Sequence, residues 1–317
     1  MSPFEASHLN IIFNILILLL SVVLLWVGAD HLVDSATRIA TKLGISDLVI
    51  GLTVVAFGTS APEFAVTIDA ALKGQADISV GNIVGSNIFN LGFILGSVAM
   101  IKSIKTTPKM VHRDGVFMIL VTFLLLFFFY DNHLARYEGG LLFALLTAYM
   151  IYLFVMKEPM AEGEELCTEH PTTKDIFILP ASLAAIVAGG HFLVGSASFL
   201  AKSAGISEWV IAVTIVAAGT SAPEMATSIA AVLKGKPGMS AGNLIGSDLF
   251  NILGVLGLAG IINPMSINPE AYNSLIMLSG FVILVVIFLR THWTVTRLEG
   301  GILFTIGVIR WIIDFMK

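Results

Sequence analysis

The fold is decided by one six-residue stretch, Gly58-Thr59-Ser60-Ala61-Pro62-Glu63, which recurs unchanged as Gly219-Thr220-Ser221-Ala222-Pro223-Glu224. Each copy places a carboxylate, two hydroxyls and a proline inside an apolar run. A proline in a helix interior removes one amide donor and displaces a carbonyl. A carboxylate at membrane depth is costly and marks a functional site by default. The two copies therefore predict two broken helices that serve one function.

The composition is that of a membrane protein. Of the 317 residues, 56% are apolar and only 12% are charged, and the mean hydropathy is +0.92. A soluble domain carries about 25% charged residues. Nearly uncharged runs of membrane-spanning length recur along the whole chain. We therefore expect an all-α membrane protein without a soluble domain. A single cysteine, Cys167, excludes an intramolecular disulfide.

Apolar runs and polar breaks predict ten transmembrane helices. They cover residues 10–40, 45–72, 79–101, 111–129, 138–156, 174–201, 206–233, 240–262, 271–290 and 297–315. The first run follows Glu5 and His8 rather than a basic segment, so we interpret it as a retained helix and not a signal peptide. The chain then divides into a first half (1–156), an acidic loop (157–173) and a second half (174–317).

The two halves are a repeat. A shift of 161 residues aligns 44–90 with 205–251 without a gap, and 27 of these 47 positions are identical. Five helices per repeat force the halves into opposite orientations, which is the plan of secondary transporters with a site near the bilayer midplane. We therefore predict two inverted five-helix repeats in which helices 2 and 7 are broken.

The distribution of basic residues predicts the orientation. With the N-terminus outside, 12 of the 17 Lys and Arg residues lie on the inner side, and the outer side keeps Lys73, Arg136, Lys202, Arg310 and Lys317. The positive-inside rule then places both termini outside and the 157–173 loop in the cytoplasm. The glutamates of this loop lack the spacing of a calcium loop, so we interpret it as a solvated acidic segment.

Oxygen-bearing residues gather around the two breaks. The proline kinks free carbonyls such as those of Thr59 and Thr220, and Ser60 with Glu63 and Ser221 with Glu224 lie beside them. The following helices carry Asn82, Ser86 and Asn90 on one face, and Asn243, Ser247 and Asn251 repeat this spacing. One such stripe alone indicates hydrogen bonding between helices. Its second occurrence after a Pro-Glu helix favours a polar site.

The expected ligands are hard oxygen atoms, without histidine or thiolate, which argues against zinc or copper. Two carboxylates balance one Ca²⁺, which takes 6–8 oxygen ligands, and equally suit two or three Na⁺ or protons. A pocket that cannot hold both sets at once couples their transport by competition.

The motif Gly-Thr-Ser-Ala-Pro-Glu followed by Gly-Asn-Xaa-Xaa-Gly-Ser-Xaa-Xaa-Phe-Asn, twice in inverted halves, resembles the α-repeats of the cation/Ca²⁺ antiporter superfamily, and most of all its prokaryotic sodium/calcium exchangers. The resemblance covers essentially the whole chain. It implies ten helices, four ion sites between helices 2, 3, 7 and 8, and sliding of helices 1 and 6. The metal ligands that it implies are Ala56, Thr59, Glu63, Ser86, Asn90, Ala217, Thr220, Glu224, Ser247 and Asn251. Ser60 and Ser221 are added as candidate metal ligands because they lie beside the two breaks.

One position departs from some relatives. Some archaeal relatives and the K⁺-dependent exchangers of this superfamily carry Asp where this chain has Asn251, and the nearest acid is Asp248. On a helix, Asp248 points about 60° away from Asn251, which leaves open that it reaches the edge of the site. We expect it instead to lie behind the ligands or at the membrane interface, since its repeat mate is the neutral Asn87. The pair Asn90 and Asn251 resembles K⁺-independent exchangers.

The leading hypothesis is a secondary active transporter that exchanges Na⁺ for Ca²⁺ by alternating access and exports Ca²⁺ from a prokaryotic cell. Ca²⁺/H⁺ exchange and K⁺-dependent exchange stay open, so H⁺ remains a third candidate ion. A channel is disfavoured because two inverted halves converge on one site instead of forming a ring. A hydrolase is disfavoured because no repeated base accompanies Ser60 and Ser221. We expect no enzyme activity, cofactor, nucleic acid or obligatory protein partner.

Overall fold

The computed structural model describes residues 3–156, 174–206, 215 and 217–315. The first half begins with α1 (Pro3–Leu43) and continues with short helices: α2 (Asp47–Ile50), the π-helix η1 (Gly51–Val55), α3 (Ala56–Thr59) and α4 (Ala61–Leu72). It then contains α5 (Ala76–Phe89), η2 (Asn90–Ile94), α6 (Leu95–Ile101), β1 (Ile104–Lys105), η3 (Met110–Gly115), α7 (Val116–Phe128), η4 (Phe129–Asp131), β2 (His133–Leu134) and α8 (Arg136–Met156).

The described part of the second half repeats this order, except that no π-helix equivalent to η3 precedes α15. It begins with α9 (Asp175–Ser203) and continues with α11 (Ala217–Thr220), α12 (Ala222–Leu233), α13 (Pro237–Leu249), η6 (Phe250–Leu256) and α14 (Gly257–Ile262). The remaining elements are β3 (Met265–Ser266), α15 (Pro269–Arg290), η7 (Thr291–Trp293), β4 (Thr294–Val295) and α16 (Arg297–Phe315).

The helices confirm a multi-pass membrane protein. Within the described residues, 7 helices are long and apolar enough to cross a membrane, and the bent pair Asp47–Thr59 and Ala61–Leu72 raises this number to 8. The expected span 206–233 lies partly outside the described residues. The expected span 297–315 forms α16 but does not belong to this apolar set. The count of ten helices therefore stays a prediction. The acidic loop 157–173 lies outside the described residues, so the division of the chain at this loop also stays a prediction.

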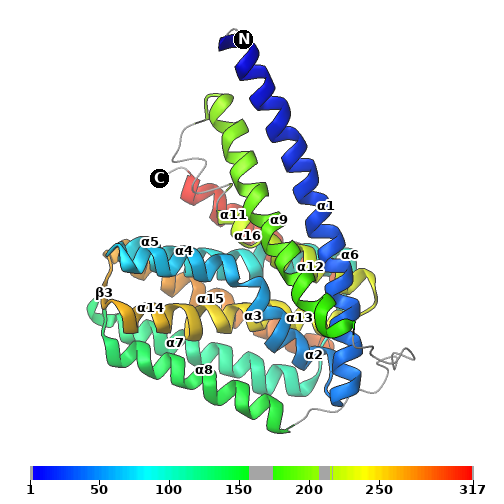
Figure 1. Cartoon of the computed structure of the whole chain (residues 1–317). Coiled ribbons are helices and arrows are strands. Elements are labelled where there is room, and N and C mark those ends of the chain that lie inside the picture. Colours follow the sequence, from blue (N-terminus) through cyan, green and yellow to red (C-terminus); the bar gives the residue numbers. More distant parts are fainter. Residues whose placement is uncertain (1–2, 157–173, 207–214, 216, 316–317) are drawn as a thin grey trace.

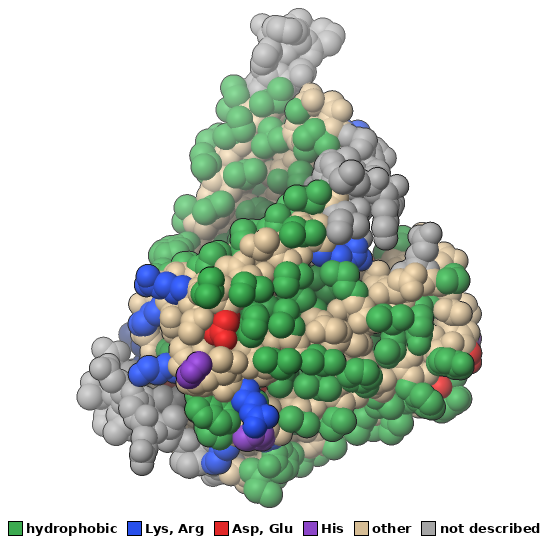
Figure 2. All heavy atoms as spheres, turned by 180° about the vertical axis from the view of Figure 1, so that it is seen from behind, with side chains coloured by type: hydrophobic (Ala, Val, Ile, Leu, Met, Phe, Trp, Pro, Cys, Tyr) green, Lys and Arg blue, Asp and Glu red, His purple; other side chains and the backbone are tan. Residues whose placement is uncertain are grey.

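Two long helices lean together across a bundle of the others. Helices α1 and α9 lie side by side, and the bundle beneath them contains α4, α5, α7, α8, α14 and α15 (Figure 1). Arg38 of α1 pairs with Asp175 of α9 at 2.7 Å. Seen from behind, hydrophobic side chains cover most of the surface, and Lys and Arg gather toward one side (Figure 2).

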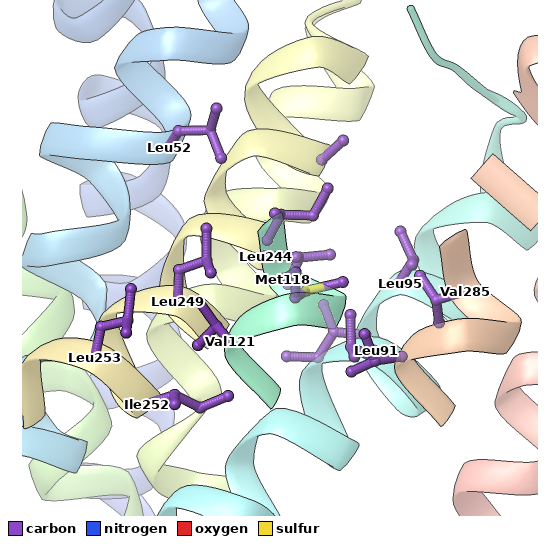
Figure 3. Close-up of a cluster of buried hydrophobic side chains, with 14 of the residues drawn as sticks. Leu52, Leu91, Leu95, Met118, Val121, Leu244, Leu249, Ile252, Leu253 and Val285 are labelled. Atoms are coloured by element: carbon purple, nitrogen blue, oxygen red, sulfur yellow. The ribbon is translucent and has the colours of Figure 1, made fainter. Parts of the chain in front are cut away.

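Leucine, isoleucine and valine side chains from both halves fill the centre of the bundle. Leu244 and Leu249 of α13 meet Leu91 of η2 and Val121 of α7 in one cluster (Figure 3). Leu91, Leu244 and Leu249 are fully buried. The core is therefore shared between the halves, and van der Waals packing of these side chains helps to hold the halves together.

The halves also exchange equivalent contacts. Helix α6 packs against α16, and α14 packs against α8. Strand β1 pairs antiparallel with β4, and β2 with β3. A shift of 161 residues relates α6 to α14, α8 to α16, β1 to β3 and β2 to β4. The α6–α16 contact is therefore equivalent to the α14–α8 contact, and the β1–β4 pair is equivalent to the β3–β2 pair. Each half therefore supplies the partner that the other half needs.

Close packing of α8 against α14 requires a glycine. A Cβ atom added at Gly139 would lie 2.7 Å from the carbonyl oxygen of Gly257 and 2.9 Å from the backbone nitrogen of Ile261. At the adjacent Gly140, no described atom lies within 4 Å of an added Cβ. The two glycines therefore differ in steric constraint although they share one helix.

We predict that Gly139→Ala lowers the melting temperature of the purified protein while Gly140→Ala leaves it unchanged or raises it. The added methyl group at residue 139 must push two backbones apart, and overpacking of this kind costs about 1–3 kcal/mol. At residue 140 the same change only improves helix propensity, by about 1 kcal/mol. Thermal unfolding in detergent measures both, and equal shifts for the two variants would contradict the packing argument.

Candidate functional site

The repeated six-residue stretches form two helix breaks. The backbone leaves helical geometry at Ser60 (φ −77°, ψ 7°) and at Ser221 (φ −89°, ψ 9°), and the first break bends its span by 50°. Pro62 and Pro223 lie in the first turn of α4 and α12, where a missing amide donor costs nothing. The breaks are thus confirmed, but the prolines begin new helices instead of kinking continuous ones.

Each break places one carboxylate inside the protein. Glu63 and Glu224 occupy the first turn of α4 and α12, where the helix dipole favours negative charge. Both side chains are fully buried, with 0% exposure. Within the described part of the chain, no Lys or Arg forms an ion pair with either of them. Two buried acids without a cationic partner are unfavourable unless another cation joins them.

The two breaks support each other through reciprocal hydrogen bonds. The Ser221 hydroxyl donates to Glu63 Oε1 at 3.0 Å, and the Ser60 hydroxyl donates to Glu224 Oε1 at 3.2 Å. Each serine therefore holds the carboxylate of the opposite half. This reciprocity brings the two copies of the motif to one place.

Hydroxyl groups from the facing helices complete this group. Ser86 lies beside the Glu63 carboxylate, and Thr59 and Ser247 lie beside the Glu224 carboxylate. Thr59 Oγ1 also lies 3.4 Å from Ser247 Oγ. Seven predicted site residues thus meet at one point: Thr59, Ser60, Glu63, Ser86, Ser221, Glu224 and Ser247.

The remaining predicted residues have different surroundings. Thr220 is buried at the end of α11. The Ala56 carbonyl accepts hydrogen bonds from Ser60 N at 3.1 Å and from Thr59 Oγ1 at 3.3 Å. Ala217 begins α11, and the surroundings of its side chain lie outside the described part. Ion binding by any of the twelve residues stays a prediction.

The first members of the two stripes hold the backbone of the acidic helices. Asn82 Nδ2 donates to the Glu63 carbonyl at 3.4 Å, and Asn243 Nδ2 donates to the Glu224 carbonyl at 3.4 Å. The same amides reach Thr67 and Ser228, each at 3.0 Å. Thr67 and Ser228 were missed from the sequence, although they lie 161 residues apart and one helical turn after each Glu.

The last members of the stripes lie in a buried group of amides. Asn90 Nδ2 donates to Asp248 Oδ1 at 3.1 Å, and Asn251 Nδ2 donates to Asn87 Oδ1 at 2.9 Å. Asn87 Nδ2 in turn donates to the Asp248 carbonyl at 3.2 Å. Asp248 is 1% exposed, so it lies inside the bundle and not at its surface.

Several buried oxygen atoms at this site have no hydrogen-bond partner among the described residues. They are Glu63 Oε2, Glu224 Oε2, Asp248 Oδ2, Asn90 Oδ1 and Asn251 Oδ1. Buried polar atoms are nearly always paired, so a group of unpaired oxygens requires an explanation. Carboxylate and amide oxygens are the ligands of hard cations. The donor set therefore suits Ca²⁺ or Na⁺.

Helix α9 lies directly over both breaks. A Cβ atom added at Gly58 would collide with the side chain of Leu183, and one added at Gly219 would collide with Val194. A Cβ atom at Gly190 would lie 3.4 Å from the Pro223 ring. The absence of side chains at these glycines lets α9 cover the carboxylates closely.

A second acidic group, Asp30, His31 and Asp34 on α1, brings its ligand atoms within 4.8 Å of one another. Lys234 Nζ lies 2.8 Å from Asp30 Oδ1 and 2.7 Å from Asp34 Oδ1. A protein cation therefore already pairs with both carboxylates. Their contact links α1 to the end of α12.

Comparison with known proteins agrees with this geometry. The family described as sodium/calcium exchanger protein matches residues 13–155 and 174–309. The chain is 36% identical to the sodium/calcium exchanger MaX1 of Methanosarcina acetivorans, with 92% of this chain and 95% of that protein covered. It is 37% identical to the putative antiporter CaxA of Alkalimonas amylolytica, with 92% and 94% covered.

A solved structure has the same fold. The sodium-calcium exchanger NCX_Mj, soaked with zero Na⁺ and Ca²⁺, superimposes with a TM-score of 0.84 at 27% identity, over 94% of this chain and 98% of that one. The fold and the buried carboxylate pair define a multi-pass membrane protein of the ion-exchanger class. The chain belongs to the sodium/calcium exchanger family.

We predict that Asn243→Leu destabilises the protein more than Asn14→Leu. Asn243 also accepts from Thr59 Oγ1 at 3.1 Å, so its loss leaves several buried groups unpaired, at about 1–3 kcal/mol each. Asn14 only donates to Asn10 on the exposed face of α1. Thermal unfolding in detergent without Ca²⁺ tests this, and similar melting temperatures for the two variants would show that the Asn243 contacts contribute little.

Proposed function

We propose that the protein is a secondary active transporter that exchanges Na⁺ for Ca²⁺ by alternating access. One observation carries the proposal: Glu63 and Glu224 are both buried, each is held by a serine of the opposite break, and each keeps one unpaired oxygen. Two carboxylates balance the charge of one Ca²⁺. Membership of the sodium/calcium exchanger family favours this cation over other divalent ions.

In this proposal the ligands come from both halves. Glu63 and Glu224 supply the charge, and the hydroxyl or carbonyl oxygens of the neighbouring residues complete the coordination. The full set is Ala56, Thr59, Ser60, Glu63, Ser86, Asn90, Ala217, Thr220, Ser221, Glu224, Ser247 and Asn251. Na⁺ ions compete for the same oxygens, because the pocket cannot neutralise a Ca²⁺ and several Na⁺ at once. Competition of this kind couples the two fluxes.

The proposed architecture is ten helices in two inverted repeats, with five helices on each side of the 157–173 loop. Reciprocal contacts at an offset of 161 residues support it, since β1–β4 corresponds to β3–β2 and Ser60–Glu224 corresponds to Ser221–Glu63. Inverted repeats give a transporter two related conformations, one open to each side of the membrane. Alternating access therefore follows from this architecture.

The proposed moving part is the pair α1 and α9. Their ends are joined by the Arg38–Asp175 ion pair, so they move together. Helix α9 covers the breaks at glycine positions, where no side chain obstructs sliding. Movement of this pair past the breaks exposes the carboxylates to one side of the membrane at a time.

The coupling ion in this proposal is Na⁺, and Ca²⁺ leaves the cytoplasm on the inward Na⁺ gradient of a prokaryotic cell. Asn at positions 90 and 251 favours K⁺-independent exchange. A Ca²⁺/H⁺ exchanger is the second candidate, because buried carboxyl groups also bind protons. In either form, the proposed exchange needs no added protein partner or cofactor.

Flux measurements in proteoliposomes test the function. We expect vesicles loaded with Na⁺ to take up Ca²⁺ when external Na⁺ is replaced by choline, because outward Na⁺ flow drives the exchange. Glu63→Gln and Glu224→Gln are expected to abolish uptake while the protein still folds, since each removes a charge that a neutral amide cannot replace. Wild-type uptake in either variant would refute the site.

Separate gradients of Na⁺, K⁺ and H⁺ identify the coupling ion. Uptake that persists without Na⁺ but requires an outward proton gradient would replace the proposal with Ca²⁺/H⁺ exchange. Currents that do not saturate at transporter turnover would indicate a channel instead.

The single cysteine tests the proposed orientation, with both termini outside. Cys167 lies in the 157–173 segment, so a membrane-impermeant maleimide is expected to label it in inverted vesicles but not in intact cells. The control is Cys167→Ser combined with Lys317→Cys, which is expected to be labelled in intact cells. Labelling of wild-type Cys167 from outside would reverse the orientation.

A further inference from the structure

Asp248 is a third acidic group beside the carboxylate pair. It follows Ser247 on α13 and is 1% exposed. Its Oδ1 accepts a hydrogen bond from Asn90 Nδ2, and its Oδ2 has no partner among the described residues. No ion pair joins it to a Lys, Arg or His in the part of the chain that the structure describes. An ionised carboxylate in this position needs a cation from outside the protein.

Hydrogen bonds to Asp248 fix the orientation of the amides around it. The Asp248 carboxylate and carbonyl can only accept hydrogen bonds, so they fix the Nδ2 atoms of Asn90 and Asn87 toward Asp248. The Asn87 oxygen is thereby turned to Asn251, whose Nδ2 donates to it. The orientation of all three amides is therefore determined by Asp248.

Three residues of this hydrogen-bonded chain, Asn90, Asp248 and Asn251, each keep one unpaired oxygen. Asn90 Oδ1 and Asn251 Oδ1 are both buried without a partner among the described residues, like Asp248 Oδ2. Asn251 lies three residues after Asp248, and therefore on a neighbouring part of the helix surface. Asn90 reaches the group from η2 of the other half. Both η2 and η6 are π-helical here, a feature that frequently accompanies functional sites.

We propose that Asp248 Oδ2, Asn90 Oδ1 and Asn251 Oδ1 form a subsite for Na⁺, with Asp248 as its charged ligand. One carboxylate with two neutral oxygens matches a monovalent ion, whereas Ca²⁺ needs 6–8 oxygens and more charge. The repeat mate of Asp248 is the neutral Asn87, so the second half alone supplies this charge. The inference rests on the proposed Na⁺/Ca²⁺ exchange and names a residue that determines its Na⁺ affinity.

The subsite is coupled to the carboxylate pair by charge. Glu224 lies close enough to Asp248 for their charges to interact. Na⁺ at Asp248 therefore opposes Ca²⁺ at the Glu63–Glu224 pair through like-charge repulsion, in addition to direct competition for ligands. Removal of the Asp248 charge is expected to weaken Na⁺ binding far more than Ca²⁺ binding.

The test is Asp248→Asn in proteoliposomes, since Asn keeps the shape and still accepts from Asn90. We expect the Na⁺ concentration for half-maximal Ca²⁺ uptake to rise about tenfold, which corresponds to about 1.4 kcal/mol. Exchange of ⁴⁵Ca²⁺ for Ca²⁺ without Na⁺ is expected to change less than about twofold, as it depends on the two glutamates. A second variant, Asp248→Asn with Asn251→Asp, returns the carboxylate to the subsite and is expected to restore the Na⁺ dependence.

The outcomes separate this inference from the proposed function. Absence of Na⁺-driven Ca²⁺ uptake in the wild-type protein would overturn the proposed function itself. Wild-type exchange with an unchanged Na⁺ dependence in Asp248→Asn would overturn the subsite alone. Equal loss of Ca²⁺/Ca²⁺ exchange and Na⁺ dependence would assign Asp248 to the Ca²⁺ site, and failure of the double variant would assign it a structural role. Either result would contradict the Na⁺ subsite.

Discussion

The structure depends on the burial of Glu63 and Glu224 in the centre of an apolar bundle. Each ion is costly to remove from water, and their mutual repulsion adds to that cost. Two interactions offset part of this cost: the helix dipole at the N-termini of α4 and α12 favours the carboxylates, and serine hydroxyls of the opposite half donate hydrogen bonds to them. It leaves one oxygen of each carboxylate unpaired. Under the proposed function, a cation completes the coordination of these oxygens, and its binding offsets part of the cost of burying the carboxylates.

The reciprocity of these contacts explains why the two halves form one folding unit. Ser221 donates to Glu63 and Ser60 donates to Glu224, so each half supplies a hydrogen bond to the acid of the other half. The strands also pair between the halves, because β1 pairs with β4 and β2 pairs with β3. An exchange of equivalent contacts keeps the two breaks at one level in the bundle. A small shift of one half would separate both serines from their carboxylates at once.

The breaks and the carboxylate pair could be predicted from the sequence, because proline, glycine and buried charge have strong local consequences. The neighbours of the stripe residues could not. Helical periodicity places Asn82 and Asn90 on one face but does not say that Asn82 holds the Glu63 backbone while Asn90 meets Asp248. Asp248 was expected behind the ligands or at the membrane interface because its repeat mate is neutral. Its burial is set by tertiary contacts with the other half, which no local pattern contains.

The differences between the halves set a preference between conformations. A perfectly symmetric pair of inverted repeats would give its two access states equal free energy. Here Lys234 joins α12 to Asp30 and Asp34 of α1, whereas its repeat mate Lys73 pairs with Asp69 on its own helix. The positions equivalent to the two α1 acids are His191 and Gly195, which cannot provide the same contact. Under the proposed mechanism, the Lys234 contact must break when α1 and α9 slide. It therefore stabilises one access state, and no equivalent ion pair stabilises the other.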